Sequence, residues 1–281
     1  MLMIPSGTML LSRFVAMYPI ATDNIETLLQ QTDGFVVNTI DKTVAAIRYV
    51  NTYDESVVIA QTIMEAHSFD PVSLDMEGNL NVGGHASLIQ LHHKLTGVVV
   101  FDIYRCRLIL ESPIGLRQVL ESQQIVKVFH ACLADSRALI CQFNLKLVHV
   151  WDIQLGHALL HGRSRYEISK LNDILGEFGI ENPIKETVRH RPGLWEQRPI
   201  ADHLLRYAAY DVVYLGYIHK SLLLSLGTRN CGKWQLWSDD AVYDPNRKKE
   251  PKTPKPKATR KTKATLRTTP AGKASVTETS S

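Results

Sequence analysis

The sequence predicts an α/β fold in which a central mixed β-sheet is flanked by helices. Three apolar runs of strand length, residues 71–78, 86–91 and 97–103, are joined by short turn segments, a pattern typical of a meander of neighbouring strands. From residue 115 onward, strand-like and helix-like patterns alternate, which indicates helices packed on the faces of a sheet. The hydrophobic content of 44% is that of a chain with one large or two small globular domains.

The segment before the first apolar run predicts a helix. Asp54 and Glu55 place negative charge in its first turn, where the helix dipole favours it, and apolar residues then recur at helical spacing as far as Met64. Earlier and weaker patterns are a helix at residues 25–29 and strands at residues 34–39 and 43–50. The sheet is therefore expected to begin before residue 50.

Later segments predict further alternating elements. Helices are expected at residues 115–123, 135–143, 166–178 and 202–226, a strand at 125–130, and a short segment at 148–153 that leads into another helix. Three prolines mark residues 182–199 as a loop. The helix at 202–226 has a continuous apolar face, which indicates that it packs against the sheet.

Charge is divided unevenly along the chain. Residues 245–281 contain eleven Lys and Arg against two Glu, a net charge of +9, so the preceding part carries −5. An acidic body suits cation binding, whereas a basic tail suits phosphate binding, a nuclear-localisation signal or a solvated end with no role. Its Pro, Lys, Thr and Ala content is too polar to offset the entropy of ordering. We therefore expect an N-terminal extension at 1–40, a folded domain at 41–228 and a basic, mostly disordered tail at 229–281.

The composition favours an intracellular protein. Four cysteines without CxxC spacing indicate reduced thiols and no disulfides. The sequence has no run of 18 or more apolar residues, so we expect no membrane span and no membrane partner. The first 22 residues contain no acid and one arginine, Arg13, a weak likeness to a mitochondrial presequence. Nucleus, cytoplasm and mitochondrion all stay open.

The chemistry centres on two carboxylates in the first apolar run, Asp75 and Glu77. Side chains two residues apart on a strand leave from the same face, so these two point together. Two unit charges about 4 Å apart repel by roughly 4 kcal/mol at an effective dielectric constant near 20. Either a divalent cation offsets this repulsion, or one of the two carboxylates is simply solvated at the end of the strand.

Two more carboxylates occur where the pattern would bring them close to this pair. Asp135 begins the helix that follows the strand at 125–130, and Asp211 lies four residues after Tyr207 in the helix at 202–226. Residues four apart on a helix share a face, so this phenol and carboxylate are neighbours. Four carboxylates suit a pair of hard divalent ions such as Mg²⁺ or Mn²⁺.

Three segments together resemble the motifs of a known family. Residues 74–78 (LDMEG) resemble its first motif, a DxE on a strand, and residues 129–135 (FHACLAD) resemble its second. Residues 207–211 (YAAYD) resemble the third, Yx3D, preceded at 195–199 by the WxxRP of ribonuclease D-like proteins. From residue 48 to 226 the chain thus resembles the tyrosine-bearing branch of the DEDD 3′–5′ exonucleases, nearest to ribonuclease D, Werner-type and 3′–5′ exonuclease domain-containing proteins.

The resemblance implies a ribonuclease H-like fold and hydrolysis at the 3′ end of single-stranded nucleic acid. Substrate preference cannot be carried over from ribonuclease D, whose additional helical domains have no counterpart in the pattern after residue 227; we expect RNA in preference to DNA. It implies that Asp75, Glu77 and Asp211 hold a first metal ion. Asp75 would bridge to a second ion, which Asp135 would help to position, and Tyr207 would orient the attacking water. Two such ions activate the nucleophile and neutralise the leaving oxygen.

Two residues are expected to contact the substrate. The resemblance implies that Glu77 meets the terminal 3′-hydroxyl, and Arg198 is the candidate for a phosphate contact. The rival interpretation is a catalytically weak or inactive adaptor that binds nucleic acid through the same fold. Loss of a site carboxylate would favour that rival, but all of them are present.

Three other patterns are interpreted as structural. His157 and His161 lie four residues apart without the glutamate of an HExxH zinc motif, so we expect a packed helix there. Asp102 ends an apolar run, but no acid follows two residues later, which favours an ordinary strand end. Asp152 is expected to cap the helix that follows it.

Overall fold

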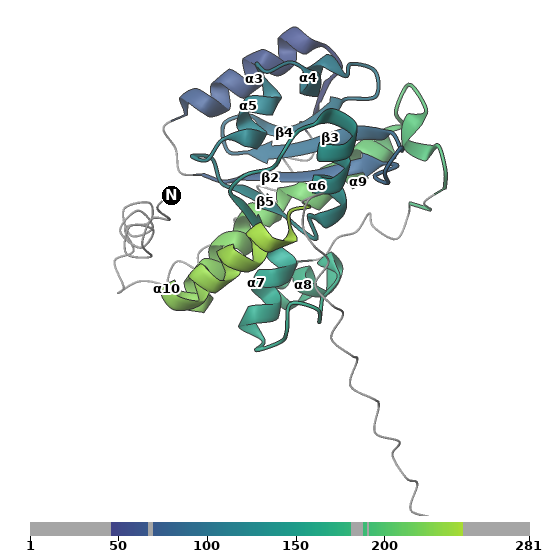
Figure 1. The fold of residues 1–281 in the computed structure, drawn as a ribbon. Coiled ribbons are helices and arrows are strands. Elements are labelled where there is room, and N and C mark those ends of the chain that lie inside the picture. Colours follow the sequence, from purple (N-terminus) through teal and green to yellow (C-terminus); the bar gives the residue numbers. More distant parts are fainter. Residues whose placement is uncertain (1–45, 67–69, 181–187, 190, 244–281) are drawn as a thin grey trace, which may run out of the picture. The chain divides into compact units, whose positions relative to one another are not determined.

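The computed structural model describes residues 46–66, 70–180, 188–189 and 191–243 (Figure 1). The chain divides into residues 1–245 and 246–281, and every described residue belongs to the first unit. The helix expected at 25–29 and the strand expected at 34–39 lie outside the described residues. The elements are β1 (Arg48–Val50), α3 (Tyr53–Glu65), β2 (Val72–Gly78), β3 (Ala86–His93), β4 (Gly97–Asp102), α4 (Leu108–Glu111), α5 (Leu116–Glu121), β5 (Lys127–Phe129), α6 (Leu133–Phe143), β6 (Val150–Asp152), α7 (Ile153–Leu160), α8 (Leu171–Glu177), the 3₁₀ helix η1 (Leu194–Glu196), α9 (Asp202–Val213) and α10 (Leu215–Ala241).

The strands of the described chain form one mixed sheet in the order β1-β4-β3-β2-β5-β6. β2, β3 and β4 pair antiparallel, as expected for the meander, whereas β1 lies parallel to β4, and β2, β5 and β6 lie parallel to one another. This sheet with its flanking helices confirms the predicted α/β architecture. β2 lies inside the sheet, so the strand that carries Asp75 and Glu77 is held by hydrogen bonds on both sides.

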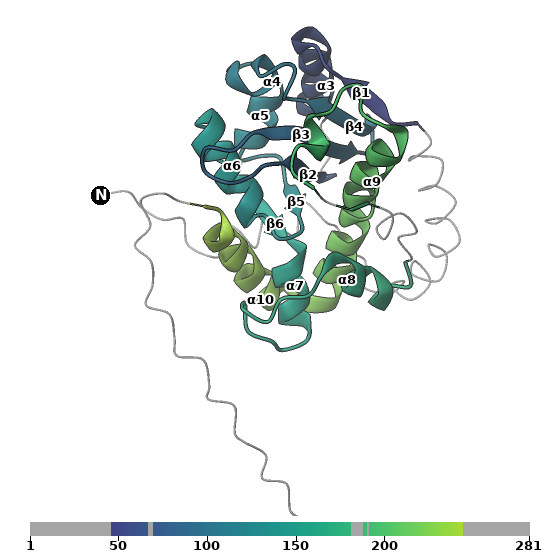
Figure 2. The ribbon, with the colours of Figure 1, turned by 90° about the vertical axis from the view of Figure 1, so that its right-hand side faces the viewer.

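Different helices cover the two faces of the sheet (Figure 2). On one face, Leu74 and Met76 of β2 pack in a core with residues of α3, α5 and α6. On the other face, α9 contacts β2, β3 and β4. Because alternate residues of a strand point to opposite faces, Asp75 and Glu77 lie on the α9 side. The alternation therefore places the apolar side chains of β2 in the core on one face and its two carboxylates toward α9 on the other.

The long helix expected at residues 202–226 is two helices in the structure. α9 ends at Val213, and α10 begins at Leu215. α10 is itself interrupted at Gly227, whose φ of 65° is a conformation that glycine adopts without steric cost. An apolar stripe reports which side of a helix is buried but not whether its backbone is continuous, so the sequence pattern could not reveal the break near Tyr214.

The folded region also extends further than the sequence indicated. Trp234 of α10 is fully buried, and its Nε1 donates a hydrogen bond to the main-chain oxygen of Asp152 at 2.7 Å. Its ring packs so closely on Gly156 that a Cβ atom there would lie 2.5 Å from it. Core packing therefore continues beyond Leu226, where the apolar pattern of the sequence stops. A single large aromatic side chain can bury much apolar surface in a helix that lacks a continuous apolar stripe. The sequence pattern therefore did not predict that this helix packs on the core.

Smaller differences concern α8 and α4. α8 begins at Leu171 rather than at residue 166, because the amide of Lys170 donates to the carboxylate of Asp173 and so marks the first turn. The single-turn helix α4 has no counterpart among the expected elements. Within the described residues, no helix combines the length and apolar character that crossing a membrane requires.

Candidate active site

β2 supplies the first two side chains of the site. Asp75 and Glu77 are both partly buried and stand opposite Gln90 and Leu88 of β3. The strand ends immediately afterwards at Gly78, where the register shifts and φ is 127°. A Cβ atom at this glycine would lie 2.6 Å from the main-chain nitrogen of Ser87, so only glycine permits this close approach of the two strands. The tight strand end fixes the position of the Glu77 side chain.

α9 supplies the third carboxylate, Asp211, which is buried with 6% of its surface exposed. One carboxylate oxygen from each of Asp75, Glu77 and Asp211 lies within 4.8 Å of the other two, and we call these residues the carboxylate cluster. Three like charges at this spacing repel strongly unless a cation lies among them. Carboxylate oxygens are the ligands that hard divalent cations prefer.

Tyr207 lies one turn before Asp211 on α9 and is also buried. Burial raises the pKa of its phenol, and the negative charges of Asp211, Glu77 and Asp75 raise it further. The phenol is therefore a neutral O–H donor beside the carboxylate cluster at physiological pH. Its ring packs near that of Trp195 in η1, with centroids 5.9 Å apart.

Asp135, in the first turn of α6, lies next to β2 but not within the carboxylate cluster. Its carboxylate accepts a hydrogen bond from the main-chain amide of Met76, the residue between Asp75 and Glu77. Burial raises the pKa of Asp135, and the nearby charge of Asp152 raises it further. Its Oδ1 is buried without a hydrogen-bond partner among the described residues. An unpartnered buried oxygen beside three converging carboxylates fits a second divalent cation.

Arg198 occupies a different position from the predicted phosphate contact. Its Nε and one terminal nitrogen donate to the two carboxylate oxygens of Asp102, each at 2.5 Å, and the other terminal nitrogen donates to the oxygen of Trp195 at 2.7 Å. Asp102 is fully buried and also accepts from Tyr49 and from the amide of Arg105. In this structure Arg198 therefore forms an ion pair that joins the segment around η1 to the end of β4, and its contact with a phosphate stays a prediction.

Asp102 is thus more than the ordinary strand end that the sequence suggested. Burial alone would raise the pKa of its carboxyl, but the hydrogen bonds from Arg198 and Tyr49 hold the pKa below its usual value. The two partners are 96 residues apart in the chain, and no local pattern links them. The one signal in the sequence is an acid that ends an apolar strand, because such a position is close to the core and its charge then needs a partner.

A second convergence of ligating side chains lies between α7 and α8. The Nε2 atoms of His157 and His161 lie 2.9 and 2.8 Å from the same carboxylate oxygen of Glu177, and we call these residues the His–Glu cluster. His157 is fully buried, in agreement with the expected packed helix. The HxxxH pattern contains no glutamate of its own, and Glu177 of the next helix, α8, takes that place. No sequence motif specifies the spacing between this glutamate and the two histidines. Asp152 caps α7 as expected, since its carboxylate accepts from the amide of Gln154.

Comparison with protein families gives a match over most of the described chain. A family model described as 3′–5′ exonuclease matches residues 48–226, which is more than half of the sequence. Ribonuclease D of Pseudomonas paraeruginosa is 32% identical over 105 residues, 37% of this chain and 26% of the relative. Exosome complex component 10 of Homo sapiens is 23% identical over 191 residues, 66% of this chain and 20% of the relative. The chain thus spans about a quarter or less of these curated relatives.

Solved structures share the fold. The RNase D of Trypanosoma brucei in complex with RNA U12 matches with a TM-score of 0.61 and 21% identity, covering 74% of this chain and 73% of that one. The catalytic core of RRP6 from the same organism gives 0.55 and 22%, covering 70% and 51%. Brucella melitensis NrnC with bound Mg²⁺ gives 0.53 and 18%, covering 70% and 90%.

Proposed function

The chain belongs to the 3′–5′ exonuclease family, and from that premise we propose that it is a metal-dependent exonuclease that removes nucleotides from the 3′ end of single-stranded nucleic acid. Its fold is the ribonuclease H-like exonuclease fold of the RNase D and RRP6 structures. The observation that carries the proposal is the carboxylate cluster, in which β2 and α9 bring Asp75, Glu77 and Asp211 together beside the phenol of Tyr207. Such a constellation suits phosphodiester hydrolysis.

The carboxylates are the proposed metal ligands. Asp75, Glu77 and Asp211 would hold a first Mg²⁺ or Mn²⁺, and Asp75 with Asp135 would help to hold a second. When bound, the ions supply positive charge that lowers the pKa of a water and stabilises charge on the phosphate oxygens. The fold's contribution is to hold the three acids of the carboxylate cluster close together, an arrangement that a bound cation would stabilise. The Mg²⁺ in the NrnC structure belongs to that relative and supports this choice of ion.

Tyr207 is the proposed positioning residue for the attacking water. Burial and, after it, the charges of the surrounding carboxylates raise the pKa of its phenol, so the hydroxyl keeps its proton and can donate a hydrogen bond or accept one from water. Glu77 is proposed to contact the terminal 3′-hydroxyl as well as a metal ion. A neutral donor held beside acids orients a nucleophile without competing for the cation.

RNA is the proposed substrate in preference to DNA. The curated relatives are named for ribonuclease and exosome functions, and the RNase D structure that shares this fold holds an RNA. We propose that the exonuclease domain begins before β1 and includes α10 as far as Ala241, because Trp234 belongs to its core. The basic segment 245–281 is proposed to add electrostatic affinity for phosphates.

A degradation assay tests the function directly. Single-stranded RNA and DNA of one sequence, labelled at the 5′ end, are incubated with the full chain in Mg²⁺, Mn²⁺ or EDTA. We expect a ladder that shortens from the 3′ end, faster with RNA, and no reaction in EDTA. A 3′-phosphorylated RNA serves as the matched control and should resist, because its terminal hydroxyl is blocked. Tight binding of RNA without cleavage in either metal would instead establish a non-catalytic adaptor.

A further inference from the structure

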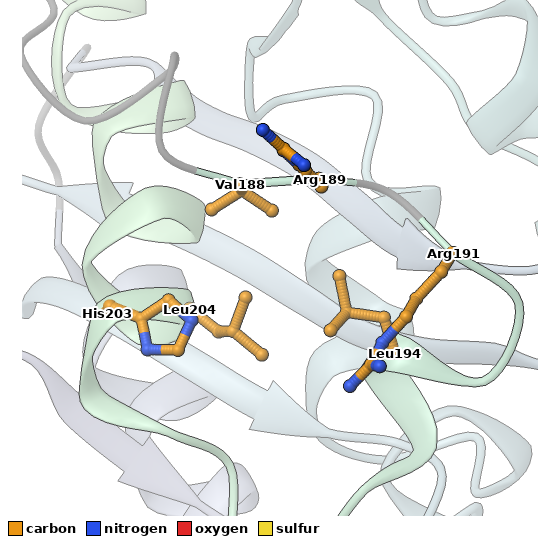
Figure 3. Close-up of a pocket in the computed structure, with 6 residues that line it drawn as sticks. All are labelled: Val188, Arg189, Arg191, Leu194, His203 and Leu204. Carbon is orange, nitrogen blue, oxygen red and sulfur yellow. The ribbon is translucent and has the colours of Figure 1, made fainter.

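A cationic pocket opens beside the first turn of α9 (Figure 3). Its cavity volume is about 300 Å³, within the usual range for ligand pockets. Apolar side chains of Val188, Leu194 and Leu204 face the hollow, and three basic side chains stand around it. The basic residues are Arg189, Arg191 and His203.

The pocket lies on the same side of α9 as the carboxylate cluster. At 100° per residue, Tyr207 projects between the directions of His203 and Leu204, one turn further along the helix, and Asp211 follows one turn later. With a rise of about 1.5 Å per residue, the pocket is roughly 6 Å from Tyr207 along the axis and 12 Å from Asp211. Leu194 and Leu204 also belong to the same buried cluster as Tyr207. The pocket therefore lies beside the candidate site, one to two turns away along α9.

The charges around the pocket are available to a ligand. Both arginines and the histidine are exposed, and none has an ion-pair partner in the part of the chain that the structure describes. Arg198, only a few residues further on, is in contrast fully engaged with Asp102. Guanidinium groups without an ion-pair partner bind anions, and the apolar side chains beside them can contact a flat apolar group. The pocket therefore suits a ligand that has both an anionic group and a flat apolar surface.

Single-stranded nucleic acid has this combination at every residue. Its phosphates pair with arginine, and its bases stack on guanidinium or imidazole planes and on apolar side chains. We propose that the pocket binds the strand on the 5′ side of the scissile phosphate, with Arg189 and Arg191 neutralising backbone phosphates and His203 and Leu204 contacting a base. This inference rests on the proposed exonuclease function and adds the path by which the substrate reaches the site.

The test compares two double variants of the full chain that remove the same amount of charge. Arg189→Ala/Arg191→Ala removes the proposed phosphate contacts. Lys146→Ala/Lys220→Ala removes two exposed cations that do not line the pocket and is the matched control. The substrates are a 12-nucleotide RNA and the p-nitrophenyl ester of thymidine 5′-monophosphate, which is too short to span both sites.

For the arginine variant we expect the kcat/KM ratio of the 12-mer to the ester to fall at least tenfold. The fall should appear mainly in the KM of the 12-mer, because the contacts act on binding. The slope of log affinity against log salt should decrease by about 1.4, since each of the two phosphate contacts on a single strand contributes roughly 0.7. The lysine variant should retain the wild-type ratio and nearly the wild-type slope.

Binding is also measured by fluorescence anisotropy of the labelled 12-mer in EDTA, independently of cleavage. An arginine variant that binds as tightly as wild type, with an unchanged salt slope, would overturn the proposed subsite. An equal fall in kcat/KM for the ester and the 12-mer would also overturn it, because the ester is too short to reach the pocket and should not lose a contact there. If wild-type protein hydrolysed neither substrate, the exonuclease function would be refuted. The anisotropy measurement would still show whether Arg189 and Arg191 contribute to binding of the 12-mer.

Discussion

The carboxylate cluster and the His–Glu cluster each bring three side chains with metal-binding atoms within 4.8 Å of one another, yet their charges balance in opposite ways. In the His–Glu cluster, Glu177 accepts hydrogen bonds from both imidazoles, so the anion is satisfied by its own neighbours. In the carboxylate cluster, three acids face one another, and each pair repels by about 3 kcal/mol at an effective dielectric constant near 20. The two clusters therefore differ in the chemistry of their members: imidazoles accompany the carboxylate in one, whereas all three ligand groups of the other are carboxylates, the groups that hard divalent cations prefer.

The two clusters are also held in place differently. β2 and α9 fix the carboxylate cluster through core packing that involves none of the three acids themselves. The His–Glu cluster links α7 to α8 through its own hydrogen bonds. The same chemical change, carboxylate to carboxamide, should thus remove function in one cluster and only stability in the other.

The largest expected effect is on catalysis by Asp75→Asn. Loss of a metal ligand should reduce cleavage of 5′-labelled RNA by about a thousandfold or more. Without metal the urea midpoint should equal or slightly exceed that of wild type, because one repelling charge is gone. Glu177→Gln, the same change in the His–Glu cluster, is the control and should cleave normally. Near wild-type cleavage by Asp75→Asn would end the exonuclease interpretation.

Tyr207→Phe should have the next largest effect. The change keeps the ring and its packing near Trp195 but removes the hydroxyl beside the carboxylate cluster. A misoriented nucleophile should lower kcat on the order of a hundredfold. The Mn²⁺ concentration for half-maximal activity should hardly move, because the phenol is not a proposed ligand. If this variant cleaved at the wild-type rate, the water would be oriented by another group, and the role given to Tyr207 would be wrong.

Metal ions should stabilise the fold through one cluster alone. At ten times its dissociation constant, a bound ion adds about 1.4 kcal/mol to the free energy of unfolding. Thermal unfolding in increasing Mn²⁺ should therefore show a rising Tm for wild type and for Glu177→Gln, but little rise for Asp211→Asn. A rise that depended on His157 and His161 instead would place the ion in the other cluster.

The smallest effect concerns pH and Glu177. Its hydrogen bond with His157, with the nearby His161, lowers the pKa of the Glu177 carboxyl below its ordinary 4.5. A lowered pKa contributes stability above the unfolded-state value, and this contribution is lost as pH falls through the folded-state value. Glu177→Gln should therefore be less stable than wild type by under 1 kcal/mol at neutral pH, because the side chain is 44% exposed. Urea unfolding should show this gap closing below pH 4.5; a gap independent of pH would contradict the ion pair.

Local periodicity predicted the parts of the fold that repeat within one element. The alternation in β2 gave the shared face of Asp75 and Glu77, and helical spacing gave the shared face of Tyr207 and Asp211. Which helix lies over which strand depends on the whole fold, so spacing alone did not place Asp211 beside Asp75. The resemblance to the exonuclease motifs supplied that expectation, and the geometry agrees with it.

The interactions that the sequence did not reveal all join distant positions. Arg198 pairs with Asp102, and Glu177 with His157, through contacts that no local pattern encodes. Each of these side chains is charged or strongly polar, and such residues are expected by default to face solvent. Only the structure distinguishes a charge that faces water from one that is buried against a partner.

The second half of α10 has a consequence for how the sheet avoids self-association. β6 is the last strand of its side of the sheet, so its outer main-chain groups have no strand to pair with. Side chains of α10 take that place: Trp234 donates to the oxygen of Asp152, Gln235 donates to the oxygen of Val150, and Ser238 accepts from the amide of Asp152. A chain cut at residue 226, where the family match ends, would expose an edge that invites intermolecular strand pairing and aggregation.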